Sequence, residues 1–310
     1  MFDAMTLSKE QIVTELKSRL TAAAAVRLDE PLARKTTLRV GGPADVYVEP
    51  SSETELSETV RFCLEQHVPL MLLGRGSNLL IRDGGIRGVV VSLAHPQFSK
   101  IEMFNDHLHC GAGARLKAIS IEARRNHFSG FEFLEGIPGT LGGALRMNAG
   151  AMGSATFDFV ETLRYMDRSG EVRELPRGEI SVNYRSCPLL KENIALGAIL
   201  KGQPALAEAV AQKMKEFSLK RWDSQPAQPS AGCMFKNPVA IPAGKLVEEL
   251  GFKGTRVGGA MVSDVHGNFI VNEANATARN VLELIELIKA RAKETRGIEL
   301  ETEVEIVGED

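Results

Sequence analysis

Hydrophobic residues along the chain follow two spacings, one typical of helices and one typical of strands, and segments of the two kinds alternate. Helical spacing begins at Ile12, Leu16 and Leu20, ahead of a run of alanines. Further along, helices are predicted at 56–64 and 116–125, and strands at 46–48, 70–73, 89–91, 108–110, 162–166, 172–175 and 195–200. This order predicts a mixed α+β fold.

The pattern changes near residue 203. An amphipathic helix is predicted over 206–220, and the Gln- and Pro-rich segment Gln225–Ser230 is typical of a linker. The rest of the chain predicts helices at 245–250 and near 281–288, and strands at 269–272 and 303–307. Since 310 residues exceed the usual size of one domain, we expect a smaller second unit beyond residue 203.

Composition and charge exclude several classes of protein. Hydrophobic residues make up 44% of the chain, charged residues 25%, and the net charge of −3 includes no basic block for nucleic acid. Apolar stretches are far shorter than the roughly 20 residues of a membrane helix, and Met1–Leu20 lacks the apolar region of a signal peptide. Cys63, Cys110, Cys187 and Cys233 show no paired or metal-ligating spacing. We therefore expect a cytoplasmic protein without a structural metal or disulfides.

Two glycine-rich segments are candidates for phosphate binding. Gly74–Leu79 follows a predicted strand, where backbone N–H groups could converge on phosphate oxygens, although an ordinary turn explains the segment equally well. It is no Walker A loop, because no Lys-Ser/Thr pair follows the glycines. Gly136–Gly150 would lose much conformational entropy on folding unless a ligand occupied the groove that it leaves. Together the two segments fit one elongated phosphate ligand; the alternative for Gly136–Gly150 is a tightly packed turn before a strand.

Four further side chains could take part in chemistry. Arg185, after Tyr184, suits bidentate binding of a carboxylate, although a lone arginine is usually a solvated surface residue. Cys233 has small neighbours, and most such cysteines are inert and apolar. Glu303 and Glu305 alternate along the last predicted strand and would face one side of it, as on an ordinary solvated strand.

These segments, taken in order, resemble one family. The shared motifs are TLRVGG (37–42), GRGSNLL (74–80), GIPGTLGGA (136–144) with MNAGA (147–151), NYR (183–185), AGCMFKNP (231–238), KGTRVGGAMVSDVHGNFIVN (253–272) and LETEVEIVG (300–308). They closely resemble the MurB family of UDP-N-acetylenolpyruvoylglucosamine reductases, from about residue 33 to residue 308. Each motif alone is only moderately specific, and their order makes the resemblance specific.

The resemblance implies a fold and a domain division. We expect an FAD-binding domain of vanillyl-alcohol-oxidase type, built of two α+β subdomains, and a smaller α+β domain that binds the substrate. By position, residues 1–70 plus 300–310 form the first FAD-binding subdomain, 71–203 the second, and 204–299 the substrate-binding domain.

The resemblance also implies roles for individual residues. Non-covalent FAD would be held by Gly74, Arg75, Gly76, Ser77, Asn78, Leu79, Gly136, Ile137, Pro138, Gly139, Thr140, Gly142, Asn148 and Gly150. Arg185, Cys233 and Glu303 match the three catalytic positions. Tyr184, Asn237, Lys253 and His266 match positions that bind the UDP-sugar. No metal is implied, and a monomer is our default.

The implied reaction reduces UDP-N-acetylglucosamine enolpyruvate to UDP-N-acetylmuramate, a step in peptidoglycan precursor synthesis. NADPH reduces FAD and leaves, and reduced flavin then passes hydride to C3 of the enolpyruvyl group. Arg185 and Glu303 would stabilise the enolate-like intermediate, Glu303 as an acid or by holding a proton donor. Cys233 would deliver a proton to C2.

Two features depart from the common pattern of the family. Cys233 stands where serine is usual, and a thiol with a pKa of about 8.5 is a stronger acid than a hydroxyl. Ten residues separate Arg185 from Leu196, and the tyrosines are Tyr47, Tyr165 and Tyr184, so the insertion that supplies a tyrosine lid is absent from the sequence. The chain therefore looks like the shorter, lidless subclass.

Two other functions stay open. A flavin oxidase of the same superfamily would often attach FAD to a histidine near the phosphate loop, but Gly74–Asp83 contains none. Oxygen uptake by the reduced enzyme would distinguish an oxidase from a reductase. A non-catalytic flavin- or nucleotide-binding module would have no need of Arg185, Cys233 and Glu303, all of which are present.

Overall fold

The structure is a computed structural model that describes residues 7–310, and the chain divides into two compact units. The large unit comprises Met1–Leu28, Val46–Gly74 and Gly88–Leu219, and the small unit comprises Asp29–Asp45, Arg75–Arg87 and Lys220–Asp310. Residues 1–6, part of the predicted first FAD-binding subdomain and of the stretch without a signal peptide, lie outside the described residues. The division into three domains stays a prediction.

The large unit contains helices and strands of ordinary length together with several short ones. Its helices are α1 (Lys9–Arg19), α2 (Glu53–Glu65), α3 (Leu116–Arg125), α4 (Leu141–Arg146) and α5 (Leu189–Glu192), with 3-10 turns at Pro96–Phe98, Glu132–Gly136, Thr156–Asp158 and Arg177–Glu179. Its strands are β3 (Leu70–Leu72), β6 (Ile101–Phe104), β7 (His107–Gly111), β8 (Phe128–Ser129), β9 (Gly150–Ala151), β10 (Ser154–Ala155), β11 (Val160–Met166), β12 (Val172–Pro176), β13 (Ile194–Leu200) and β14 (Gln203–Pro204).

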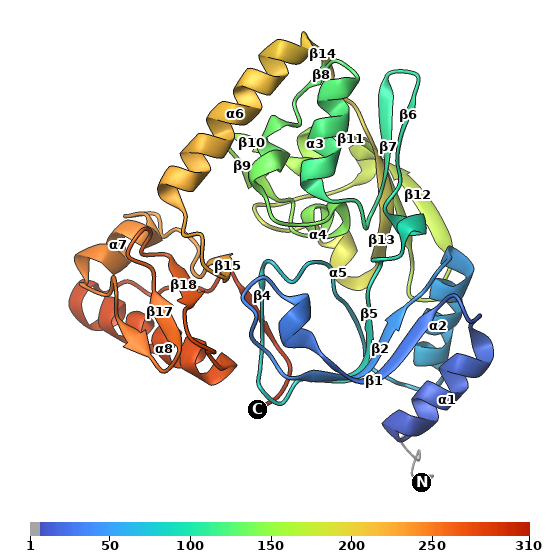
Figure 1. Cartoon of the computed structure of the whole chain (residues 1–310), viewed down its shortest axis with the longest axis horizontal. Coiled ribbons are helices and arrows are strands. Elements are labelled where there is room, and N and C mark those ends of the chain that lie inside the picture. Colours follow the sequence, from blue (N-terminus) through green and yellow to red (C-terminus); the bar gives the residue numbers. More distant parts are fainter. Residues whose placement is uncertain (1–6) are drawn as a thin grey trace. The chain divides into compact units, whose positions relative to one another are not determined.

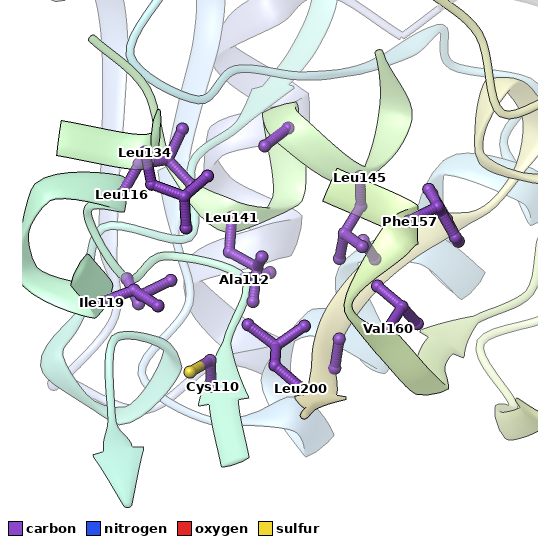
Figure 2. Close-up of a cluster of buried hydrophobic side chains, with 14 of the residues drawn as sticks. Cys110, Ala112, Leu116, Ile119, Leu134, Leu141, Leu145, Phe157, Val160 and Leu200 are labelled. Atoms are coloured by element: carbon purple, nitrogen blue, oxygen red, sulfur yellow. The ribbon is translucent and has the colours of Figure 1, made fainter. Parts of the chain in front are cut away.

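A five-stranded sheet in the order β12-β11-β13-β7-β6, antiparallel at every pair, organises the larger core of this unit. Apolar side chains from α3 and α4 pack on it: Ile119 and Leu145 are completely buried, and Leu200 lies among them in Figure 2. Gly142 comes so close to the sheet that a Cβ atom there would lie 3.1 Å from Ala112 Cβ. Tight packing of α4 on this core therefore explains at least one glycine of the second glycine-rich segment.

A second core in the large unit lies beneath α1 and α2. Leu16, Leu56 and Phe62 are fully buried there, together with Met166 and Leu196 of the five-stranded sheet. Another sheet has the strand order β1-β2-β5-β3 (Figure 1). The boundary between the two units falls within each of its strands β1 (Ala25–Pro31), β2 (Pro43–Glu49) and β5 (Ile86–Val91). The last boundary between the units along the chain, between residues 219 and 220, falls within α6 (Ala207–Ser224).

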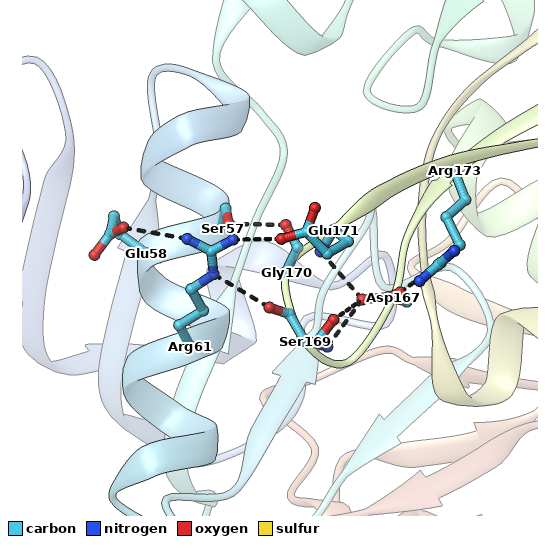
Figure 3. A network of polar contacts seen from close by, with 8 residues as sticks. All are labelled: Ser57, Glu58, Arg61, Asp167, Ser169, Gly170, Glu171 and Arg173. Atoms are coloured by element: carbon cyan, nitrogen blue, oxygen red, sulfur yellow. Dashed lines mark hydrogen bonds and ion pairs between the residues drawn. The ribbon is translucent and has the colours of Figure 1, made fainter.

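Polar contacts fasten the turn between β11 and β12 to α2 (Figure 3). Arg61 Nη2 donates to Glu171 Oε1 at 2.6 Å, and Arg61 Nε donates to the carbonyl of Ser169 at 3.2 Å. Ser57 Oγ donates to the carbonyl of Gly170 at 2.8 Å. Asp167 stiffens the turn itself by accepting from the backbone of Ser169 and Glu171. These exposed contacts fix the orientation of the turn relative to α2, and each of them contributes little to the free energy of unfolding.

The small unit is built from three separated segments of the chain. It contains the 3-10 turn Leu32–Lys35, α7 (Ala243–Glu249), α8 (Ala278–Arg296), β4 (Leu79–Ile81), β15 (Ser230–Cys233), β16 (Arg256–Val257), β17 (Ala260–Val262), β18 (Phe269–Asn272) and β19 (Glu305–Val307). The strands β15-β18-β17-β16 form an antiparallel sheet, whereas β19 pairs with β4 in parallel. Leu246, Val281 and Ile285 pack into its apolar core.

The longer helices and strands lie close to those predicted from hydrophobic spacing, and two of the predicted segments differ from the structure. α1 ends at Arg19, and the alanine run leads into β1 instead of ending the helix. The last strand begins at Glu305, so Glu303 precedes it, and the predicted alternation of Glu303 and Glu305 on one strand is wrong. A bridge between Phe235 and Thr302 holds the backbone just before Glu303 instead.

Candidate active site

The first glycine-rich loop turns sharply at Gly76, which has a φ of +57°. A Cβ atom there would lie 2.8 Å from Thr36 Cα, so the position accepts only glycine. Thr37 N donates to the carbonyl of Gly76 at 3.3 Å. Among the described hydrogen bonds, none uses the backbone N–H groups of Arg75, Gly76 or Ser77 as donor. This short run of N–H groups has the chemistry of a phosphate cradle, which fits the pyrophosphate of FAD.

The end of the loop and β4, which follows it, are hydrogen-bonded to the C-terminal segment of the small unit. Asn78 Nδ2 donates to the carbonyl of Glu303 at 3.2 Å, and Glu305 N donates to the carbonyl of Asn78 at 3.0 Å. Leu79 is then paired with Glu305 in the parallel register of β4 and β19. The side chain of Asn78 therefore holds the backbone of Glu303, a contact that the sequence did not predict.

Cys233 and Glu303 lie on two backbone segments that are hydrogen-bonded to each other. Cys233 is the last residue of β15, and Glu303 N donates to the carbonyl of the next residue, Met234, at 2.8 Å. The start of β15 is held by Thr37, whose Oγ1 donates to the carbonyl of Ser230 at 2.7 Å. The structure thus brings together two of the three predicted catalytic residues, both within the small unit.

Asn237, Lys253 and His266, predicted to bind the UDP-sugar, gather around α7. Asn237 Oδ1 accepts from the N–H of Ala243, the first residue of α7, at 3.0 Å. Lys253 Nζ forms an ion pair with Glu248 Oε2 at 3.0 Å. His266 lies against the same helix, since a Cβ atom on Gly244 would be 2.6 Å from its Cε1.

His266 is held as a neutral imidazole. Burial lowers the pKa of His266 below its usual value, and the nearby charge of Lys253 lowers this pKa further. The N–H of Asn268 donates to His266 Nδ1 at 3.0 Å, which requires Nδ1 to be the acceptor. The proton therefore lies on Nε2, where it can be donated to a ligand oxygen.

In the large unit, the second glycine-rich segment (136–150) is hydrogen-bonded to the turn that contains Arg185. Asn148, with a φ of +39°, donates from Nδ2 to the carbonyl of Asn183 at 3.3 Å. Arg185 itself has a φ of +55°, and its Nη1 donates to the carbonyl of Gly150 at 3.2 Å. Its guanidinium lies 4.9 Å from the ring centroid of Tyr184. Side-chain and backbone contacts thus fix a guanidinium in a backbone conformation that few non-glycine residues adopt.

The other cysteines differ from Cys233 in their surroundings. Cys63, Cys110 and Cys187 are buried, whereas Cys233 is partly exposed. Burial raises the pKa of Cys63 to about 12 and that of Cys110 to about 12, and burial also raises the pKa of Cys187. Buried thiols of this kind are inert apolar side chains, so the predicted structural role of these three fits their environment.

Comparison with known families identifies both parts of the chain. Residues 44–176 match the model of an FAD binding domain, and residues 225–307 match the model described as UDP-N-acetylenolpyruvoylglucosamine reductase, C-terminal domain. The chain is thus an FAD-dependent oxidoreductase with an α+β fold. A UDP-N-acetylenolpyruvoylglucosamine reductase from Syntrophus aciditrophicus is 43% identical over 305 residues, which cover 96% of each chain. The chain belongs to the family of UDP-N-acetylenolpyruvoylglucosamine reductases.

Other members of the family support the same conclusion. The reductase from Syntrophomonas wolfei is 40% identical over 92% of this chain and 96% of its own length. The crystal structure of the reductase from Thermus caldophilus superposes with a TM-score of 0.79 at 36% identity, and covers 91% of this chain and 98% of that one. The resemblance and the fold class predicted from the sequence are confirmed. The predicted roles of individual residues, including Cys233 in place of serine, stay predictions.

One residue with a prominent place in the site was missed from the sequence. Asn268 lies between His266 and β18 and is only 2% exposed, yet its side chain is polar. A polar residue directly before the apolar run Phe269–Val271 was the available signal.

No helix in the part of the chain that the structure describes is long and apolar enough to cross a membrane.

Proposed function

We propose that the chain reduces the enolpyruvyl group of UDP-N-acetylglucosamine enolpyruvate to give UDP-N-acetylmuramate, with NADPH as electron donor, in the cytoplasm. The observation that carries the proposal is the pairing of the Cys233 and Glu303 segments through the Met234–Glu303 backbone hydrogen bond. This pairing supports a proton donor and an acid that act on one small substrate group.

The run of N–H groups at Arg75–Ser77 would hold the pyrophosphate of FAD, and bound FAD would supply the hydride for C3 of the enolpyruvyl group. The chain's own residues then have two tasks. They stabilise the negative charge that moves onto the substrate carboxylate, and they deliver a proton to C2. Addition of one hydride and one proton saturates the double bond and leaves the rest of the substrate unchanged.

Arg185 performs the first task. A guanidinium stays charged at any relevant pH and binds a carboxylate with two parallel hydrogen bonds. Its contact with the carbonyl of Gly150 and its place beside the ring of Tyr184 hold it ready, so little reorganisation accompanies the development of charge. Glu303 supports the same charge as an acid or by holding a proton donor, because a bare carboxylate would repel an enolate.

Cys233 performs the second task by passing the proton of Sγ to C2. A thiol is a stronger acid than a serine hydroxyl, so it releases its proton more readily. The partial exposure of Cys233 allows the thiolate to take up a proton from solvent after each turnover. Asn237, Lys253 and His266 around α7 would bind the nucleotide, His266 as a donor through Nε2.

The experiment that tests the proposal follows the visible flavin band without oxygen. The purified protein is reduced with NADPH, and UDP-N-acetylglucosamine enolpyruvate is then added. Rapid return of the oxidised spectrum, with one UDP-N-acetylmuramate formed per flavin, is the expected result. If NADPH bleaches the band and the nucleotide leaves it bleached, the assigned substrate is wrong. Fast reoxidation by oxygen alone would favour an oxidase.

A further inference from the structure

Asn268 occupies the point where the pairing of β15 with β18 would otherwise end. The last pair of these strands joins Cys233 to Phe269, and Asn268 is the residue before Phe269. The carbonyl of Asn268 accepts from the N–H of Met234 at 2.8 Å, so the chain beyond Cys233 stays attached to this side of the sheet.

The side chain of Asn268 extends the pairing by one more residue. Its Oδ1 accepts from the N–H of Phe235 at 2.9 Å, and its Nδ2 donates to the carbonyl of Phe235 at 2.8 Å. The side-chain amide therefore replaces the peptide group of a neighbouring strand. Phe235 is 1% exposed, so water does not offer its backbone an alternative partner.

Met234 and Phe235 are also the residues that hold the Glu303 segment. Phe235 pairs with Thr302 in an antiparallel bridge, and the carbonyl of Met234 accepts from Glu303 N at 2.8 Å. The backbone that follows Cys233 is thus bonded to Asn268 on one side and to the residues around Glu303 on the other. Its position therefore sets how the backbones of Cys233 and Glu303 lie relative to each other.

We propose that Asn268 is a positioning residue for proton delivery: its side-chain amide fixes the Cys233 and Glu303 segments relative to each other. The proposal rests on the proposed function, in which these two side chains act on one substrate. Asn268 acts through the backbone of Met234 and Phe235 and itself touches neither reacting side chain in any described hydrogen bond. Reduction of FAD by NADPH does not need Cys233 or Glu303 and should not depend on Asn268.

The chemistry of an amide suggests a discriminating substitution. Asn268→Asp keeps the shape of the side chain, but an ionised carboxylate accepts only and would face the carbonyl of Phe235 with a second acceptor. A protonated carboxyl group has a donor and an acceptor, as the amide has. Burial and the opposing carbonyl raise the pKa of the introduced group, so it regains its proton at mildly acidic pH.

The test measures the two half-reactions separately in the FAD-loaded enzyme by anaerobic stopped-flow absorbance. Near neutral pH, Asn268→Asp should slow reoxidation by the enolpyruvyl nucleotide by about 10- to 100-fold and leave reduction by NADPH within about twofold, since misplacement by about 1 Å costs that much. Relative to wild type, reoxidation by the variant should recover as the pH falls from about 8 to about 6.

Asn272, the last residue of β18, provides a matched control close to Asn268 in the chain. Its Nδ2 donates to the carbonyls of Leu38 and Arg39 at 3.2 and 3.3 Å, and its Oδ1 accepts from Ala276 N at 2.9 Å. Asn272→Asp removes the same kind of donor without touching Met234 or Phe235. It should leave the ratio of the two half-reaction rates, and the pH dependence of that ratio, as in wild type.

The outcomes distinguish a failure of the proposed function from a failure of the positioning role of Asn268. If wild-type enzyme is not reoxidised by the nucleotide, the proposed function fails. If wild type is reoxidised and Asn268→Asp reoxidises equally fast, or slows both half-reactions equally at every pH, the positioning role is wrong. Should Asn268→Asp not retain FAD near neutral pH, Asn268→Ser replaces it: the hydroxyl cannot bridge both groups of Phe235, and the same selective loss of reoxidation is expected, with faster hydrogen exchange at the Phe235 amide. Equal loss in both half-reactions again overturns the role.

Discussion

Glu55→Gln tests whether a buried carboxylate stabilises the large unit. Glu55 lies in the first turn of α2 and is 5% exposed. Its Oε1 accepts from Thr21 N at 2.9 Å and from Thr21 Oγ1 at 2.6 Å, and its Oε2 accepts from Ser51 N and Ser51 Oγ, both at 2.7 Å. A carboxylate near the N-terminus of a helix also interacts favourably with the helix dipole.

The hydrogen bonds give the size of the effect. Burial raises the pKa of Glu55, but the bonds from Thr21 and Ser51 outweigh burial and lower the pKa from 4.5 to about 2. A folded-state pKa below the unfolded value means that the ionised form stabilises the fold. By linkage this contribution is about 3 kcal/mol above pH 5, and it is lost as the pH falls through about 2. In Glu55→Gln, an NH₂ group must face two of the four donors, so the loss is of similar size, about 3 kcal/mol.

Urea denaturation of the FAD-loaded enzyme, followed by circular dichroism at neutral pH, measures the loss. The matched control is Glu58→Gln on the same helix, where Glu58 is exposed and its oxygen lies 3.8 Å from Arg61, and it should cost less than about 1 kcal/mol. The gap between wild type and Glu55→Gln should narrow between about pH 5 and about pH 2, because over this range the carboxyl group of Glu55 takes up a proton in the unfolded chain before it does so in the folded one. Equal urea midpoints for the two variants at neutral pH would show that the buried Glu55 carboxylate does not stabilise the large unit.

Three further outcomes follow from the site and from the contacts of α2. Cys233→Ser should keep reductase activity but lose the fall in rate that ionisation of the thiol causes at alkaline pH, and it should resist inactivation by iodoacetamide; equal sensitivity to alkylation would contradict a reactive Cys233. Arg185→Lys should slow reoxidation by the nucleotide about 10-fold or more and leave reduction by NADPH unchanged, because an ammonium group cannot bind a carboxylate through two parallel bonds; unchanged stopped-flow traces would remove Arg185 from the mechanism. Arg164→Ala removes the bidentate ion pair with Glu53 at the start of α2. Because this pair is partly exposed, urea denaturation should show a free energy of unfolding lower by only about 1 kcal/mol. A loss as large as that of Glu55→Gln would contradict this small contribution.

Much of the fold could be predicted because its signals are local. The apolar run at 70–73 predicted β3, the helical spacing at 56–64 predicted α2, and the strands predicted at 162–166 and 172–175 are β11 and β12. Gly76 was notable in the sequence as part of a glycine-rich loop, and its φ of +57° explains why glycine stands there. Short strands such as β16 and β17 escaped prediction because two or three residues show no periodicity.

The candidate site was predictable in its residues more than in its arrangement. Motif resemblance singled out Cys233 and Glu303, but their pairing depends on contacts between segments far apart in the sequence, such as that of Met234 with Glu303. Asn268 has the same character: its amide is useful only because Phe235 lies opposite, and no spacing in the sequence indicates this. The expectation that Glu303 lies on the final strand failed because a bridge at Thr302, not a regular strand, holds that segment.

The most direct test of the account compares wild type with Cys233→Ala in a single turnover without oxygen. Each enzyme is reduced by NADPH in D₂O and mixed with UDP-N-acetylglucosamine enolpyruvate, and the flavin band and the deuterium content of the product are followed. We predict equal bleaching by NADPH, fast return of the band in wild type with one deuterium at C2 of the product, and a reoxidation at least about 100-fold slower in Cys233→Ala. Reoxidation of Cys233→Ala at the wild-type rate, with deuterium still delivered to C2, would show that Cys233 is not the proton donor.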